Sequence, residues 1–323
     1  MTTVLLSAPY MLPYSNRFRP VFEHYGLKLV VADVNERLSE AEILRYAGTF
    51  DAAICGDDRY SEAVIKQCLP RLKVISKWGT GIDSIDKAAA NRLGVTVWNT
   101  PNAFTLPVSD TVLGYMLAFA RQLPWLDQEV KKGGWGKFAA SSLSECTLGV
   151  IGVGNVGKAV VRRARAFGMR LLGNDVVQIA PDFVVEMGLE MTSLEVLLRE
   201  SDFISVNCDL NSTSFHLIND QALTLVKPSA VLINTARGPV VEESALIKAL
   251  QEKRLGGAAL DVYEVEPLPA DSPLRSFANV MLASHNSNSS HAAWERVHWN
   301  TLRNLVMGLG LDASDLDAFI GKI

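Results

Sequence analysis

The segment LGVIGVGNVG, residues 148–157, decides the fold of this chain. It is an apolar run that ends in three glycines, Gly152, Gly154 and Gly157, with the spacing G-x-G-x-x-G. The first glycine permits a tight turn out of a strand, the second lets a pyrophosphate approach the backbone, and the third lets the next helix pack closely on the sheet. Asp175 closes a second apolar run 23 residues beyond Gly152, where an acid that binds a ribose is expected. Together these features predict a dinucleotide site rather than a structural turn.

The residues that follow Asp175 favour NAD over NADP as the cofactor. Residues 176–181 contain no Arg or Lys. A 2′-phosphate would therefore meet the negative charge of Asp175 without a cationic partner. We expect a higher kcat/KM with the NAD coenzyme than with the NADP coenzyme.

Length and charge exclude several classes of protein. With 323 residues the chain is long enough for two domains, each with its own core. Its net charge is −4, and it has no dense basic run. We therefore expect neither a nucleic acid nor a membrane as a partner.

The four cysteines are scattered and include no C-x-x-C pair, which predicts free thiols and no metal site. Free thiols are typical of a reducing compartment. The first ten residues, MTTVLLSAPY, lack the positively charged start of a secretory signal. The expected location is therefore the cytoplasm.

Short apolar runs alternate with helical patterns along the chain, which predicts parallel sheets covered by helices. The expected strands are residues 4–8, 27–32, 52–55, 72–76 and 95–98, and then 148–152, 170–174, 203–208, 231–235, 257–262 and 280–284. The fold class is α/β, with a Rossmann dinucleotide-binding domain inserted into a smaller flavodoxin-like substrate domain. We expect the substrate domain at residues 1–100 and 290–323, and the NAD-binding domain at residues 101–289.

Three chemically useful side chains follow strands of the predicted second domain. Arg237 follows the strand at 231–235, Glu266 follows that at 257–262, and His285 follows that at 280–284. Ligands of open parallel sheets lie beyond the carboxyl ends of the strands. A histidine can exchange the proton of a hydroxyl group, a nearby carboxylate favours its imidazolium form, and a guanidinium can bind a carboxylate at two points. This set suits transfer of a hydride at a carbon that bears a hydroxyl group.

Several motifs resemble the D-isomer-specific 2-hydroxyacid dehydrogenase family. They are NTARGPVV (234–241), ALDVYEVEP (259–267), ASHN (283–286), GTGID (79–83) and NTPN (99–102). The similarity covers nearly the whole chain and looks closest to phosphoglycerate dehydrogenase-like members without a carboxy-terminal regulatory domain. The resemblance implies that Arg237 binds the substrate carboxylate, that Glu266 pairs with the histidine, and that His285 is the acid–base.

The resemblance also implies a set of cofactor contacts. Asp261 would meet the nicotinamide carboxamide, and Asp175 the adenosine ribose. The other positions that line the cofactor in relatives are Thr80, Asn155, Val156, Cys208, Thr235, Ala236 and Asn288. Two positions depart from the family pattern, because Ser284 and Asp209 stand where relatives usually or often have proline.

The first domain should supply the rest of the substrate pocket. The candidates are Lys77, Trp78 and Gly79, whose loop binds the substrate carboxylate in relatives, and Arg59. Lys77 stands where relatives that act on phosphoglycerate often have a basic residue. A phosphorylated, 3-phosphoglycerate-like hydroxy acid is therefore one candidate substrate. A solvated charge at the end of a strand is an equally good interpretation of Lys77.

We therefore expect an NAD-dependent dehydrogenase that transfers a hydride between nicotinamide and C2 of a D-2-hydroxy acid or 2-oxo acid. The alternatives are an NAD-sensing, corepressor-like interaction protein and an enzyme that oxidises a non-carbon oxyanion such as phosphite. An apolar helix at about 107–121, followed by Trp125 and Trp135, has more apolar surface than one domain needs. Relatives use this region as a dimer arm, so we expect a homodimer.

Overall fold

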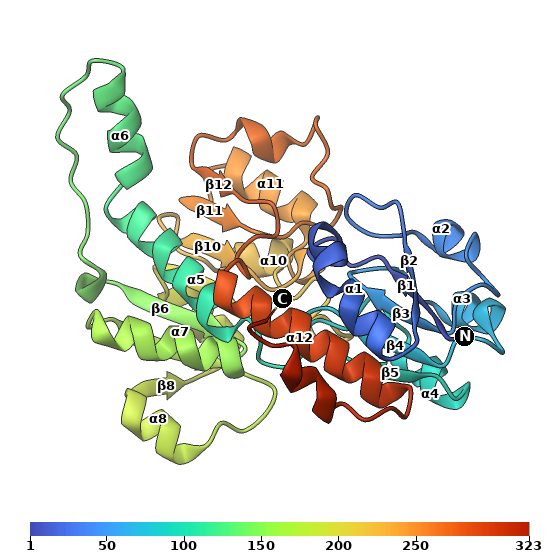
Figure 1. Cartoon of the computed structure of the whole chain (residues 1–323). Helices are drawn as coiled ribbons and strands as arrows, with labels where there is room; N and C mark the ends of the chain where they lie inside the picture. Colours follow the sequence, from blue (N-terminus) through green and yellow to red (C-terminus); the bar gives the residue numbers. More distant parts are fainter. Residues whose placement is uncertain (323) are drawn as a thin grey trace. The chain divides into compact units, whose positions relative to one another are not determined.

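The computed structural model describes residues 1–322, which form two compact units (Figure 1). Unit 1 consists of Met1–Phe104 and of the chain from Ser290 onward, and unit 2 consists of Thr105–Ser289. Within residues 1–322, no helix has the length and apolar character that crossing a bilayer requires.

Unit 1 is built on a five-stranded parallel sheet in the order β2-β1-β3-β4-β5. This is the strand order of flavodoxin-like folds. The strands are β1 (Thr3–Leu6), β2 (Lys28–Val31), β3 (Ala52–Cys55), β4 (Val74–Lys77) and β5 (Thr96–Trp98). The helices are α1 (Ser15–His24), α2 (Glu40–Leu44), α3 (Glu62–Cys68), α4 (Lys87–Arg92) and α12 (His291–Gly308). The central strands β1, β3 and β4 are buried along their whole length, including Ser76 and Lys77 at the end of β4.

Helix α12 comes from the end of the chain but completes the core of unit 1. It packs on β3, β4 and β5, and it buries Val297, Leu302 and Leu305 against the sheet. These residues recur at the spacing of one helix face, which is why the helix has a buried side and a polar side.

Unit 2 is built on a seven-stranded parallel sheet in the order β12-β11-β10-β9-β6-β7-β8. The strands are β6 (Thr147–Ile151), β7 (Arg170–Asn174), β8 (Leu189–Met191), β9 (Phe203–Val206), β10 (Val231–Asn234), β11 (Gly257–Leu260) and β12 (Val280–Leu282). The helices are α5 (Thr105–Ala120), α6 (Leu123–Lys131), α7 (Asn155–Ala166), α8 (Pro181–Met187), α9 (Leu194–Glu200), α10 (Asp220–Leu223) and α11 (Glu243–Gln251). The order reverses at β6, which makes this a Rossmann sheet and confirms the predicted fold class.

The sequence predicted six strands in unit 2, and the structure has a seventh, β8, at the edge of the sheet. It is only three residues long, and only Leu189 in it is buried. Such a strand is too short for an apolar period to be recognised. Several predicted strands also end earlier than expected, because their last residues already turn into the loops that bear the candidate site.

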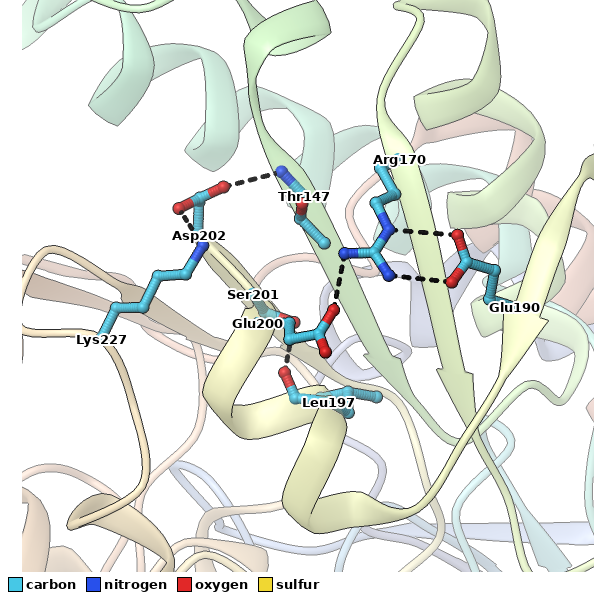
Figure 2. Close-up of polar contacts among 8 residues, drawn as sticks. All are labelled: Thr147, Arg170, Glu190, Leu197, Glu200, Ser201, Asp202 and Lys227. Atoms are coloured by element: carbon cyan, nitrogen blue, oxygen red, sulfur yellow. Dashed lines mark hydrogen bonds and ion pairs between the residues drawn. The ribbon is translucent and has the colours of Figure 1, made fainter.

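An aspartate at the amino edge of each sheet ties two neighbouring strands together. In unit 2 the Asp202 carboxylate accepts the Thr147 N–H at 2.8 Å and pairs with the Lys227 ammonium at 2.8 Å (Figure 2). In unit 1 the Asp51 carboxylate accepts the Thr3 N–H at 2.7 Å and two hydrogen bonds from the Arg71 guanidinium. Each bond satisfies an amide at the start of the first strand of its sheet, where the parallel ladder begins.

These contacts hold the Asp51 carboxyl in its charged form. The Arg71 guanidinium is the largest cause, and the Thr3 N–H adds to it, so the pKa of Asp51 lies below its ordinary value. A lowered pKa stabilises the folded state above the pKa of the unfolded chain, and this stabilisation is lost as the pH falls through the folded pKa.

We expect Asp51→Asn to lower the free energy of unfolding by about 1–2 kcal/mol at neutral pH, because it breaks a charged pair that is partly exposed. The difference from the wild type should begin to shrink below about pH 4 and should vanish only below the lowered pKa of Asp51 in the folded state. Urea titrations followed by circular dichroism from acid to neutral pH measure this. Asp33→Asn, at an exposed position of the same unit, is the control. A loss that is equal at every pH would rule out the charged pair as its source.

Candidate functional site

The turn between β6 and α7 has the shape that the glycine spacing predicts. Gly152 has a φ of +85°, and a Cβ added there would lie 2.6 Å from the amide nitrogen of Cys208. A Cβ added to Gly157 would lie 2.0 Å from the carbonyl oxygen of Gly152. By contrast, a Cβ added to Gly154 has no atom of the described chain within 4 Å. The first and third glycines therefore allow close packing, and the second borders open space.

Helix α7 begins at this turn. Its N-cap is Gly154, which has no side chain with which to cap the helix. The first N–H groups of a helix of this length carry partial positive charge. Asn155 and Val156 are the first residues of the helix, so the pyrophosphate of a dinucleotide fits here.

Asp175 lies beside the same turn, just after β7 ends. One carboxylate oxygen accepts the Val153 N–H at 2.6 Å, and the other accepts the Val177 N–H at 3.0 Å. These bonds keep a charged oxygen next to the glycine turn. Cys208 follows β9 on the neighbouring side, and burial raises the pKa of its thiol to about 11, so the thiol stays neutral.

The loop after β10 presents Arg237 with the backbone fixed by Asn234. The Asn234 amide donates to the Arg237 carbonyl at 2.9 Å and accepts the Ala236 N–H at 3.1 Å. The hydroxyl of Thr235 is buried and has no hydrogen-bond partner within residues 1–322. An orphaned buried hydroxyl at the carboxyl edge of this sheet suits a ligand with polar groups, such as a dinucleotide.

Gly238 brings this loop against the next one. A Cβ added at Gly238 would lie 1.9 Å from the Tyr263 carbonyl, so only glycine allows the approach. The Tyr263 N–H donates to one carboxylate oxygen of Glu266 at 3.0 Å. The Tyr263 hydroxyl, whose pKa burial raises to about 12, donates to the Ala283 carbonyl at 2.7 Å. Tyr263 therefore links the Glu266 loop to the segment that leads to His285.

His285 is held in a left-handed backbone conformation, with a φ of +52°. Its N–H donates to the Asp261 carbonyl at 2.8 Å. The Asp261 carboxylate, which is fully buried, accepts the next two N–H groups, those of Asn286 and Ser287, at 2.8 and 3.0 Å. A positive φ is uncommon outside glycine, and such residues cluster at functional sites.

The structure brings His285 and Glu266 together. Nδ1 of the imidazole lies 3.0 Å from Oε2 of the carboxylate, and both side chains are mostly buried, with 20% and 16% exposed. A carboxylate in this position fixes the orientation of the ring and favours its protonated form. The pair can therefore hold a proton ready for transfer at the carboxyl edge of the sheet.

Sequence reasoning missed three residues that build this site, namely Asn234, Gly238 and Tyr263. Asn234 and Gly238 lie within the motif NTARGPVV, and Tyr263 lies within ALDVYEVEP. A glycine directly after a candidate functional arginine was the available signal, because it points to a close approach of two backbones.

The predicted substrate residues of unit 1 surround the end of β4. The Lys77 ammonium pairs with Asp57 at 3.0 Å, and the indole N–H of Trp78 donates to Nδ1 of His298 at 2.9 Å. Burial lowers the pKa of His298 to about 4, so this ring is neutral and accepts the bond.

The remaining predicted residues of this unit are Gly79 and Thr80, in the same loop after β4, and Arg59, in the loop after β3. Gly79 has a φ of +109°, Thr80 donates its hydroxyl to the Thr100 carbonyl at 2.9 Å, and Arg59 is exposed. The positive φ explains why glycine follows Trp78.

A cavity of about 440 Å³ lies at the opposite, amino edge of the sheet in unit 2. It is lined by Trp125 and Phe119 and by the starts of several strands, among them Asp202 and Val231. Its lining in the described chain includes none of the predicted site residues. This cavity therefore lies apart from the predicted site residues.

Comparisons with known proteins agree with this geometry. The family model "D-isomer specific 2-hydroxyacid dehydrogenase, NAD binding domain" matches residues 113–287. A glyoxylate reductase from Korarchaeum cryptofilum is 38% identical over 252 residues, which cover 76% of this chain and 75% of that protein.

Two further proteins broaden the comparison. A D-3-phosphoglycerate dehydrogenase from Synechocystis sp. is 36% identical over 282 residues, which cover 86% of this chain but 50% of that protein. The crystal structure of D-lactate dehydrogenase from Aquifex aeolicus, complexed with NAD and lactic acid, matches with a TM-score of 0.84 at 27% identity and covers 96% of both chains. This chain therefore belongs to the D-isomer specific 2-hydroxyacid dehydrogenase family, and it is an NAD-dependent oxidoreductase of D-2-hydroxy acids and 2-oxo acids.

Proposed function

We propose that His285, Glu266 and Arg237 carry the reduction of a short 2-oxo acid to its D-2-hydroxy acid. The observation that supports this best is the 3.0 Å pair between His285 and Glu266 on adjacent loops of one sheet edge. Bound NAD(H) supplies the hydride chemistry, and the protein moves the proton and orients the substrate.

His285 is the acid in the direction of reduction. Because Nδ1 faces Glu266, Nε2 is the nitrogen that gives its proton to the carbonyl oxygen of the substrate. Glu266 is a positioning residue, because it acts through the imidazole. In the oxidative direction the same nitrogen takes the proton of the hydroxyl group.

Arg237 binds the carboxylate of the substrate. Its backbone is fixed by Asn234, and its side chain is half-buried at the carboxyl edge of the sheet. A guanidinium there can make two parallel hydrogen bonds to a carboxylate and polarise the adjacent carbonyl group.

Unit 2 is the NAD-binding domain in this proposal, and unit 1 is the substrate-binding domain. The glycine turn and the first N–H groups of α7 hold the pyrophosphate, and Asp175 binds the adenosine ribose. The Asp261 carboxylate positions the His285 loop through two backbone N–H groups. Its contact with the nicotinamide carboxamide stays a prediction. The remaining proposed cofactor contacts are Thr80, Cys208, Thr235, Ala236 and Asn288, and the proposed substrate contacts are Lys77, Trp78, Gly79 and Arg59.

The reaction is tested with NADH and a panel of 2-oxo acids, by following the loss of NADH absorbance. We expect turnover of at least one short 2-oxo acid, with a higher kcat/KM for NADH than for NADPH. His285→Ala should lower kcat by about 10²–10⁴-fold, because the acid is lost, while NADH still binds. His24→Ala is the control, since His24 pairs with Asp315 on the surface of unit 1. Full turnover in His285→Ala would remove the histidine from the mechanism.

Glu266→Gln tests the role of the carboxylate. The amide can still accept a hydrogen bond from Nδ1, but it lacks the charge that favours the imidazolium. The histidine should then hold its proton less tightly, so the pH at which reduction falls to half its maximum should decrease. We expect kcat at neutral pH to fall about 10-fold, as measured by pH–rate profiles of both enzymes. A slower enzyme with an unchanged profile would indicate only a structural role for Glu266.

We also propose that the enzyme is a homodimer that associates through residues 121–142, here called the arm. Figure 1 shows α6 and the long segment after it projecting from the rest of unit 2. The arm exposes Leu123, Val130, Trp135 and Phe138, and 81% of Trp135 is accessible. Apolar groups gathered in this way are typical of a protein interface.

Analytical ultracentrifugation at micromolar concentration should give a dimer. Replacing Trp135 and Phe138 together by Ala should shift the equilibrium toward monomer by at least 10-fold, because apolar contact area is lost. Phe167→Ala removes an exposed aromatic ring elsewhere in unit 2 and should leave the dimer intact. A wild-type protein that sediments only as a monomer would contradict the proposal.

A cytoplasmic location remains part of the proposal. It is supported by four free cysteines, of which three are buried. Free thiols of this kind persist in a reducing compartment.

A further inference from the structure

The Lys77 ammonium at the carboxyl end of β4 is buried, with only 5% of its side chain exposed. Within residues 1–322 it has two acceptors, the Asp57 carboxylate at 3.0 Å and the Trp78 carbonyl at 3.1 Å. An ammonium group has three N–H donors, so one donor is left for a ligand oxygen or a water. Leaving a buried N–H donor without an acceptor costs free energy, so the third N–H of Lys77 is a position where a ligand oxygen can bind.

Aspartates in the loop after β3 offset the charge of Lys77 at the end of β4. Asp57 neutralises Lys77 directly. Next to it, Asp58 is fully buried, and its carboxyl group accepts hydrogen bonds from the Ser7 hydroxyl and the Leu38 N–H. Burial raises the pKa of Asp58 to about 6, so near neutral pH it contributes further negative charge.

The ammonium lies directly beneath the loop that follows β4. A Cβ added to Gly79 would be 3.9 Å from Nζ of Lys77. A group held by the backbone of residues 78–80 would therefore meet Lys77 and Asp57 together.

The other side of this loop is aromatic. Tyr10 stacks on Trp78 with ring centroids 4.6 Å apart, and Trp294 lies 5.0 Å from Tyr10. The indole N–H of Trp78 is already bonded to His298. These rings place apolar groups, and no charge, on this side of the loop.

We propose that Asp57 selects the substrate by charge, so that the enzyme accepts 2-oxo acids with an uncharged C3 substituent and rejects their phosphate esters. The remaining N–H of Lys77 binds a neutral oxygen, such as a hydroxyl group on C3. This inference rests on the proposed function, because it concerns the substrate of that reaction.

The physical reason is that a phosphate group near Lys77 must also lie near the carboxylate of Asp57. A lysine that is already paired is a neutral site for an incoming anion, so it offers a phosphate no net attraction, and the phosphate would lie beside the like charge of Asp57. Rejecting a competitor by like charge is a common source of specificity.

The test compares hydroxypyruvate with its 3-phosphate ester, two 2-oxo acids with the same carbon skeleton. In the wild type we expect kcat/KM for the ester to be at least 10-fold lower than for hydroxypyruvate. Asp57→Asn removes the charge and should raise the ratio of ester to hydroxypyruvate at least 10-fold. Asp57→Glu keeps the charge and should keep the ratio low, and Asp33→Asn is the control for a distant surface charge.

Three outcomes separate the possibilities. If no 2-oxo acid is reduced, the proposed function itself fails. If hydroxypyruvate is reduced and the wild type uses the ester equally well, the selection by Asp57 is overturned, whether or not the variants fold. If the wild type rejects the ester but Asp57→Asn, shown to be folded by its reduction of hydroxypyruvate, keeps the wild-type ratio, rejection has another source and the inference is equally overturned.

Discussion

The candidate site depends on the carboxylate of Asp261, which holds the loop that bears His285. Both of its oxygens accept backbone N–H groups, from Asn286 and Ser287, and its own carbonyl accepts the N–H of His285. A hydrogen bond to a charged group contributes about 1.5–3 kcal/mol, whereas a sparsely populated backbone conformation costs about 1–3 kcal/mol. Two such bonds therefore suffice to keep His285 at a positive φ, where its ring meets Glu266.

The two units use the edges of their sheets in the same way. At the amino edges, Asp51 and Asp202 bond to the first amide of β1 and β6 and pair with a cation from the loop before the next strand. At the carboxyl edge of the sheet in unit 2, the loops that bear Arg237 and His285 are held by hydrogen bonds between side chains and the backbone. In a parallel sheet all strands have their carboxyl ends at the same edge. Hydrogen bonds can therefore stabilise the amino edge while the loops at the carboxyl edge present functional groups.

Much of this arrangement could be predicted from the sequence, because it follows from local patterns. The glycines of residues 148–157, the positions of most strands and the three candidate side chains after them depend on neighbours in the chain. The short edge strand β8 could not be recognised, because a three-residue strand with one buried residue has no period. The partner of Gly238 could not be predicted either, since the Tyr263 backbone that it approaches is distant in the sequence.

The sequence by itself determined the α/β class, the dinucleotide turn and the candidate reactive groups, because strand periodicity and glycine spacing are local properties. Only the tertiary structure decided which groups touch. It joined His285 to Glu266, assigned the Asp261 carboxylate to the His285 loop, and paired Lys77 with Asp57. These contacts connect loops that follow different strands, and their distances are set by the register and spacing of the sheet rather than by separation along the chain.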